Sequence, residues 1–96
     1  MKKINFYIGA NNTTHKVEEK KALDILASVY EGMSVTDTMG YWRGAQERSI
    51  LVSIMAESVD LTIVKSVCKR LNTALDQDAV MVEILDSNTL FISDRE

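Results

Sequence analysis

The sequence predicts an α+β domain of ferredoxin-like type, with two helices on one face of an antiparallel sheet. Strand-like alternation of apolar and polar residues occurs in four segments, and apolar residues at helical spacing occur in two. Along the chain these segments run β-α-β-β-α-β. Residues 1–96 are expected to form a single domain, since the sequence has no proline, no Ser/Gly-rich linker and no internal repeat.

The first strand and the first helix follow from the N-terminal third of the chain. Residues 3–9 alternate, and the residues on the apolar side are Ile4, Phe6 and Ile8. A polar loop follows, in which Thr13 or Thr14 is expected to cap a helix over residues 17–31. The apolar stripe of that helix consists of Ala22, Leu23, Leu26, Val29 and Tyr30. Gly32 is expected to end the helix in a left-handed conformation.

The middle of the chain predicts a β-hairpin, with strands over residues 34–43 and 48–56 joined across a turn at 43–46. The residues on one face of the second strand are Ile50, Val52 and Ile54. Gly40 interrupts the first strand, which suggests either a bulge or a kink that fits the twist of the sheet.

The second helix is expected to be capped by Ser58 or Asp60 and to run to about Leu75. Its apolar stripe consists of Val64, Val67, Cys68, Leu71, Ala74 and Leu75. Cys68 is therefore interpreted as a small buried apolar residue and not as a nucleophile. Residues 79–85 alternate as a last strand, with Val80, Val82 and Ile84 toward the helices. The apolar run at residues 90–92 indicates either a short fifth strand or a continuation of the strand at 79–85.

The sheet face away from the helices carries more apolar residues than a solvated face needs. These residues are Tyr7, Leu51, Met55, Met81 and Leu85. We expect this face to be covered by a second copy of the chain, making a homo-oligomer of two or more copies. A different partner could cover it instead, and so could the C-terminal segment around Phe91.

Composition narrows the classes of function. The net charge of −3 and the pI of about 5.1 disfavour a general nucleic-acid-binding protein. With one cysteine the chain forms no internal disulfide, which fits a reducing compartment. Neither a secretory signal nor a membrane-spanning apolar run is visible. The expected location is the cytoplasm, which is the host cytoplasm if a phage encodes the protein.

The turn region of the hairpin supplies the candidate ligand-binding residues. Tyr41 or Trp42 could stack on a flat ligand, and Arg43 or Arg48 could neutralise a phosphate. The polar contacts nearby would come from Asn11 and Asn12. The alternative interpretation is structural: Trp42 closes one end of the core, and Arg43, Glu47 and Arg48 form cross-strand ion pairs.

The sequence shows no catalytic pair, no metal site and no cofactor motif. Zinc would need a set of Cys and His ligands, and the chain has one residue of each type. His15, the one histidine, lies in a polar loop and is expected to be exposed. Residues 9–12 could hold an anion on backbone N–H groups, but an ordinary strand-to-helix turn explains them as well. Lys65, Lys69 and Arg70 are interpreted as part of a solvated helix face.

Three segments resemble a family of small bacterial and phage proteins of unknown function, whose hairpin carries a Gly-x-Trp motif. They are residues 6–9 (Phe-Tyr-Ile-Gly), residues 32–42 with the Gly-Tyr-Trp motif, and residues 47–52 (Glu-Arg-Ser-Ile-Leu-Val). The resemblance implies a ferredoxin-like fold and assigns no catalytic residues. The short turn at 43–46 differs from the longer connection of bacterial members. The Asn11-Asn12 pair is more similar to phage members.

These observations favour a non-enzymatic binding protein that self-associates through its sheet. A phage origin would suggest a counter-defence role, in which the protein blocks a host immune protein or sequesters a small nucleotide signal. One alternative is a small cofactor-free enzyme of dimeric ferredoxin-like type that uses Tyr7, Trp42, Arg43 or His15. Another is a protein-interaction module without a ligand.

Overall fold

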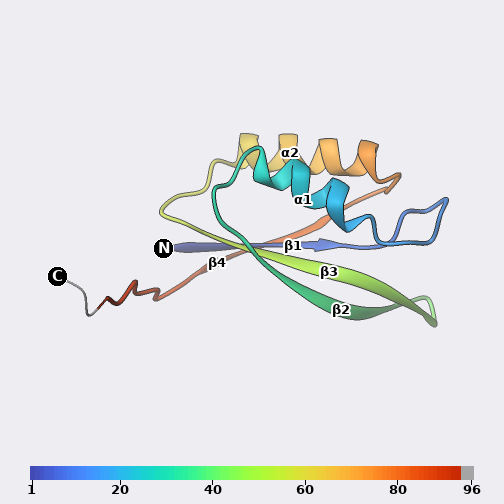
Figure 1. Ribbon diagram of the computed structural model, residues 1–96, viewed down its shortest axis with the longest axis horizontal. Coiled ribbons are helices and arrows are strands. Elements are labelled where there is room, and N and C mark those ends of the chain that lie inside the picture. Colours follow the sequence, from blue (N-terminus) through green and yellow to red (C-terminus); the bar gives the residue numbers. More distant parts are fainter. Residues whose placement is uncertain (94–96) are drawn as a thin grey trace.

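The computed structural model describes residues 1–93, and at Trp42 it describes the backbone only. The elements are β1 (Lys2–Ile8), α1 (Glu19–Ala27), β2 (Ser34–Trp42), β3 (Ala45–Ala56), α2 (Leu61–Ala74) and β4 (Met81–Asp86). The strands form one antiparallel sheet in the order β2-β3-β1-β4. Both helices cover the same face of this sheet (Figure 1). The predicted ferredoxin-like α+β fold is confirmed.

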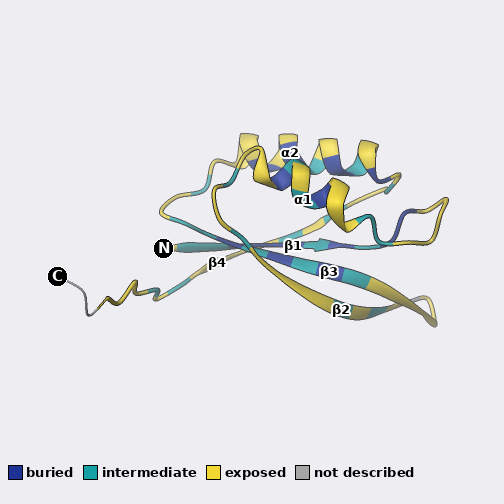
Figure 2. Cartoon of the chain, in the orientation of Figure 1, coloured by how far each residue is buried: buried dark blue, intermediate teal, exposed yellow. Residues whose placement is uncertain are grey.

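The core lies between the central strands and the two helices. Phe6 is opposite Val52 on β3 and Val82 on β4, so the three side chains share the helix-facing side. The fully buried large side chains are Phe6, Ile4, Ile8, Leu26, Ile50, Leu71, Leu75, Val52 and Val67. Burial of each contributes about 1.5 to 3 kcal/mol relative to an exposed position. The predicted core residues of β1 and β3 are confirmed, and Figure 2 shows burial concentrated on these strands.

The edge strand β4 is less buried than its alternation predicts. Val80 and Val82 are half-buried against the core, whereas Ile84 is 39% exposed although it is opposite the buried Ile4. Ile84 thus lies on the helix-facing side, as predicted, but it is not buried in the core. β4 has a neighbour on one side only, and the far half of the strand lacks the cover that β1 receives.

The helix ends are only partly as predicted. Asp60 caps α2, and its carboxylate accepts hydrogen bonds from the N–H groups of Thr62 (2.9 Å) and Ile63 (3.4 Å). α1 begins later than expected, with Glu18 at the N-cap position and no side-chain cap, so a Thr13 or Thr14 cap is wrong. α1 also ends before Gly32. Ser28 ends this helix in a right-handed conformation, and Gly32 has no positive φ.

The hairpin turn is tighter than the expected 43–46 segment. Trp42 pairs with Ala45, which leaves Arg43 and Gly44 as the two turn residues, with φ values of 50° and 81°. Two successive residues with positive φ define a type I′ turn, whose twist matches that of the flanking strands. Gly40 pairs regularly with Glu47, so β2 has no bulge at this glycine.

The C-terminal segment does not form the optional fifth strand. Residues 87–93 have no regular secondary structure, and Figure 1 shows them leaving the sheet at the end where β1 begins. Leu90, Phe91 and Ile92 are 79%, 79% and 85% exposed. Among the described residues no helix is long and apolar enough to cross a bilayer.

Candidate functional site

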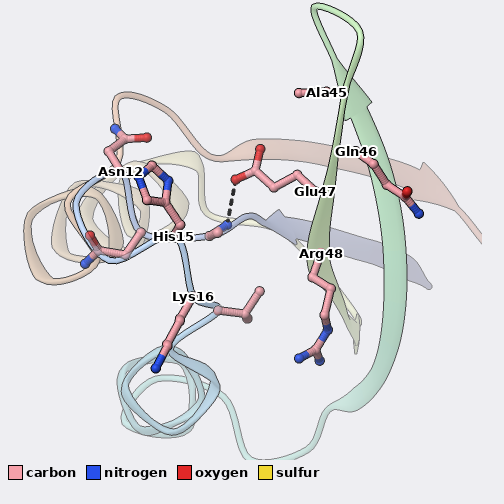
Figure 3. Close-up of a pocket in the computed structure, with 10 residues that line it drawn as sticks. Asn12, His15, Lys16, Ala45, Gln46, Glu47 and Arg48 are labelled. Atoms are coloured by element: carbon pink, nitrogen blue, oxygen red, sulfur yellow. Dashed lines mark hydrogen bonds between the residues drawn. The ribbon is translucent and has the colours of Figure 1, made fainter.

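A cleft of about 710 Å³ separates the β1–α1 loop from the start of β3. Asn11, Asn12, His15 and Lys16 line it from the loop. Gln46, Glu47 and Arg48 line it from the strand, and the two sets face one another across the opening (Figure 3). Polar and charged side chains therefore converge from segments about thirty residues apart.

The loop owes its shape to Asn11, which is only 8% exposed. The Asn11 side-chain oxygen accepts hydrogen bonds from the N–H groups of Thr13 (2.7 Å) and Thr14 (3.1 Å). Its amide nitrogen donates to the Glu18 carboxylate at 2.5 Å. The bond from the Thr13 N–H group to the Asn11 side-chain oxygen closes an Asx turn, in which a side chain replaces the backbone carbonyl of an ordinary turn. Because both ends of this side chain are occupied, Asn11 lines the cleft as part of its frame.

A second anchor ties the loop to the turn after α2. The Gln77 side chain donates to the carbonyl oxygens of Gly9 (2.5 Å) and Ala10 (3.1 Å). Asn12 N–H donates to the Asp76 carbonyl at 3.1 Å, and the Thr13 hydroxyl donates to the Asp76 carboxylate. The loop is thus fixed from both sides before any ligand arrives.

The amide groups of this loop are already in use, which argues against an anion site on the backbone. Asn11 N–H donates to the Lys16 carbonyl at 2.9 Å, and His15 N–H donates to the Asn11 carbonyl at 2.8 Å. Ala10 N–H donates to Glu47 Oε1 at 3.3 Å, the dashed contact in Figure 3. Residues 10–15 therefore form a structured turn whose donors are satisfied internally.

Glu47 is the carboxylate of the cleft. Its Oε1 atom accepts a hydrogen bond from the Ala10 N–H group. Among the described residues Glu47 forms no ion pair. The hairpin extends past the end of β1, whose last pair with β3 is Ile8 with Ile50. That overhang lets Glu47 reach the loop beyond the sheet. The remaining carboxylate oxygen is available to a ligand donor or cation.

Two positively charged side chains line the same cleft as this carboxylate. Lys16 and Arg48 are both exposed cleft residues. The Arg48 guanidinium donates to Asp37 at 3.1 Å, with the two side chains 60% and 74% exposed. An ion pair this exposed stabilises by at most about 1 kcal/mol, so Arg48 can exchange Asp37 for a ligand at little cost.

The other predicted ligand-binding residues lie at different distances from the cleft. Asn12 lines it with an exposed side chain, whereas Arg43 lies at the hairpin turn. Tyr41 is 73% exposed and shares a smaller hollow of about 90 Å³ with Glu47 and Arg48. The side chain of Trp42 lies outside the described part of the chain. Of the six predicted residues, the structure brings Asn11, Asn12 and Arg48 to the cleft.

Among the polar and charged residues that line the cleft, Lys16, Gln46 and Glu47 were not expected from the sequence to bind a ligand or to take part in catalysis. Glu47 was interpreted only as a cross-strand ion-pair partner. Its actual neighbour, Ala10, is 37 positions away in the chain. The one available signal was that the hairpin strands are longer than the first strand, which places their ends beside the loop.

The uncovered face of the sheet has a polar centre. Asn5 is 5% exposed there, donates to Glu83 at 3.0 Å and accepts from the Ser53 hydroxyl at 2.7 Å. The Tyr7 hydroxyl also donates to Glu83, at 3.2 Å. Burial, and then the bond to the Glu83 carboxylate, raise the pKa of Tyr7 above its usual value. Apolar residues surround this centre: Leu51 and Met55 are half-buried, Met81 is 63% exposed and Leu85 is 41% exposed.

The described residues contain no cluster of three or more metal-ligating side chains. Cys68 is half-buried against the core, and burial raises the pKa of its thiol. A raised pKa keeps the sulfur protonated at neutral pH, which lowers its reactivity as a nucleophile.

The fold is shared with proteins of known structure. No protein-family model matches the chain. No curated protein matches its sequence. Among solved structures, a phage SAM lyase in the apo state is similar with a TM-score of 0.64 and 18% identity, over 88% of this chain and 78% of that one. A DUF3240 family protein from Shewanella baltica OS155 is similar with a TM-score of 0.66 and 14% identity, over 96% and 97%. At these identities the comparisons support the fold.

Proposed function

We propose that this protein binds a nucleoside that carries both positive and negative charge, with S-adenosylmethionine (SAM) as the first candidate. By binding it, the protein lowers the free concentration of the ligand as a phage counter-defence function. One observation carries the proposal. The Glu47 carboxylate accepts a hydrogen bond from the Ala10 amide in a cleft that Lys16 and Arg48 also line, and the cleft is large enough for such a molecule.

The charges of the cleft select among nucleoside ligands. SAM has a sulfonium, an ammonium and a carboxylate group. Glu47 can accept the positive groups or the ribose hydroxyls, and Arg48 or Lys16 can pair with the carboxylate. A nucleoside polyphosphate fits less well, because its phosphates would approach Glu47 and the loop amides have no free donor for them.

The flat base of the ligand has a candidate neighbour in Tyr41. Its ring is 73% exposed and borders the small hollow that also contains Glu47 and Arg48. Stacking on an aromatic side chain contributes about 1 to 3 kcal/mol per base and tolerates any base. Tyr41 thus supplies affinity, while Glu47 supplies the selection by charge.

Cleavage of SAM is the second candidate function. It is favoured by the fold likeness to a phage protein named as a SAM lyase. A sulfonium is already a good leaving group. When a carboxylate oxygen of SAM attacks the side-chain carbon bound to sulfur, a C–O bond forms as the C–S bond breaks, and the electron pair of that bond passes to sulfur. The products are a lactone and a neutral thioether, and no proton has to be transferred. A site without an acid–base pair could therefore assist this reaction by fixing the ligand in a reactive conformation.

Isothermal titration calorimetry tests the proposal with three probes: SAM, S-adenosylhomocysteine and ATP. We expect SAM to bind most tightly, and S-adenosylhomocysteine to bind at least five-fold more weakly because it lacks the sulfonium charge. Glu47→Gln should remove most of that difference. Glu57→Gln, an exposed carboxylate after β3, is the matched control. No heat with SAM, or tighter binding of ATP, would contradict the proposal, and chromatography of the mixtures shows whether SAM is cleaved.

Self-association through the uncovered sheet face is a separate part of the proposal. None of the described helices covers the apolar residues around the Asn5–Glu83 centre (Figure 1). In a face-to-face contact, Glu83 would enter the interface with two hydrogen bonds already made. Light scattering after Met81→Lys and Leu85→Lys should show a smaller particle than the unmodified chain gives. An unchanged mass would contradict this contact.

A further inference from the structure

The outer side of α2 consists of cations and small side chains. After the first turn of this helix, its exposed residues are Lys65, Ser66, Lys69, Arg70, Thr73 and Ala74. The helix contains no Asp or Glu, and its large apolar residues Val64, Val67 and Leu71 face the core. Figure 2 shows the exposed residues in yellow on the side of α2 away from the sheet.

The three positive charges on this side have no carboxylate partner. Lys65, Lys69 and Arg70 form no ion pair in the described part of the chain. By contrast, both lysines of α1 are paired with carboxylates three or four residues away, at 2.7 Å. Because α2 carries +3 in a chain of net charge −3, the other residues together carry −6. A polyanion is therefore attracted to the outer side of α2 and repelled by most of the remaining surface.

A hollow of about 440 Å³ lies between this side of α2 and the neighbouring helix. The residues that line it are Ile25 of α1 and Ser66, Lys69, Arg70, Thr73 and Ala74 of α2. The Arg70 guanidinium donates to the Ser28 hydroxyl at the end of α1, at 3.1 Å, and this bond holds it beside the hollow. Since a guanidinium has five N–H donors, this contact leaves others for a ligand.

We propose that the outer side of α2 docks on the phosphate backbone of duplex DNA. Lys, Arg, Ser and Thr are among the side chains that bind phosphate oxygens in protein–DNA complexes, and the hollow brings all four types together. The helix from Thr62 to Thr73 is about 16 Å long, and over that length one DNA strand presents about five phosphates. Contacts to the backbone alone select no base sequence.

The composition of this side favours duplex DNA over other partners. The centres of protein–protein interfaces are rich in aromatic residues and poor in Lys, Ser and Ala, and the outer side of α2 has the opposite composition. Single strands are usually bound by stacking of bases on aromatic side chains, and α2 contains none. The net charge of the whole chain disfavours a general nucleic-acid-binding protein, but the structure concentrates positive charge on one face.

Three cations predict a definite salt dependence. A protein that neutralises Z phosphates of B-DNA loses affinity with a log–log slope of about −0.9Z, which gives about −2.7 for three cations. Between 50 and 200 mM salt the affinity should therefore fall about 40-fold. No residue of the hollow lines the cleft between the β1–α1 loop and β3, so the result does not depend on whether that cleft binds SAM.

Fluorescence anisotropy with a labelled 20-base-pair duplex tests the inference. The Lys65→Gln/Lys69→Gln variant should bind at least about ten-fold more weakly at 50 mM salt, and its affinity should fall only about three- to four-fold between 50 and 200 mM. Lys2→Gln/Lys3→Gln is the matched control, because it removes the same charge from β1, and it should keep the 40-fold dependence. Circular dichroism checks that both variants are folded.

Three results would overturn the inference. The first is a duplex that does not bind the unmodified protein at 50 mM salt. The second is an equal salt dependence in the α2 variant and the β1 control. The third is tighter binding of a 20-nucleotide single strand, or of a 20-residue helical peptide of Glu and Leu, which would assign the outer side of α2 to that class of partner instead.

Discussion

Replacement of Asn11 by alanine tests whether this residue frames the cleft or contacts the ligand. Asn11→Ala removes two acceptor contacts to backbone N–H groups and one donor contact to the Glu18 carboxylate. A neutral hydrogen bond contributes about 0.5 to 1.5 kcal/mol net, and one to a charged group about 1.5 to 3 kcal/mol. Water can reach the exposed Thr13 and Thr14 amides and recover part of the loss. The expected destabilisation is about 2 to 4 kcal/mol.

Thermal unfolding followed by circular dichroism measures this loss. For a domain of this size, 1 kcal/mol lowers Tm by about 4 to 8 °C, so Asn11→Ala should lower it by about 8 to 30 °C. Asn12→Ala is the matched control, because the Asn12 side chain is exposed and makes no side-chain hydrogen bond among the described residues. Its Tm should stay within about 3 °C of the unmodified protein. Equal effects of the two replacements, or an Asn11→Ala protein of unchanged Tm, would refute the reasoning.

Three further predictions concern pH, the turn and the thiol. The bond from Lys21, and then that from Asn11, lower the pKa of Glu18 below its ordinary value of 4.5, so the unfolded chain takes up the proton first as pH falls. Urea titrations should therefore show stability lost as pH falls from about 5 through the depressed folded pKa. The Glu18→Gln protein should lose less stability over that pH range. An equal loss of stability in the two proteins would disprove the coupling. Gly44→Ala forces an alanine to φ +81° and should cost about 1 to 2 kcal/mol in urea titrations; no loss would argue against a type I′ turn. Because burial raises the pKa of Cys68, iodoacetamide at pH 7.5 should modify it more slowly in the folded protein than in urea, and equal rates would contradict this.

The fold was predictable because its signals are local. Alternation in residues 3–9 and 48–56 identified the side chains that fill the core, since side chains on a strand alternate between two faces. The ends of α1 were not predictable in the same way. Asn11 forms an Asx turn that uses the Thr13 and Thr14 amides, and Ser28 ends the helix by donating to the Ile25 carbonyl at 2.6 Å.

The candidate site was predictable only in part, because its contacts join distant segments. Nothing near Glu47 in the sequence indicates that its carboxylate accepts a hydrogen bond from the Ala10 N–H group. Gln77, which anchors the loop, is 68 positions from Gly9. Sequence reasoning instead grouped Tyr41, Trp42, Arg43 and Arg48 because they are close in the chain. The structure separates Arg43 from the cleft, because the two-residue turn puts it at the far end of the hairpin.

The central claim is that the cleft between the β1–α1 loop and the start of β3 binds SAM. Titration of SAM into ¹⁵N-labelled protein, followed by two-dimensional NMR, tests it residue by residue. The amide shifts are predicted to gather in residues 10–17 and 45–48. An unchanged spectrum at saturating SAM, or shifts gathered around residues 29–34 and 53–55 at the other end of the sheet, would contradict the claim.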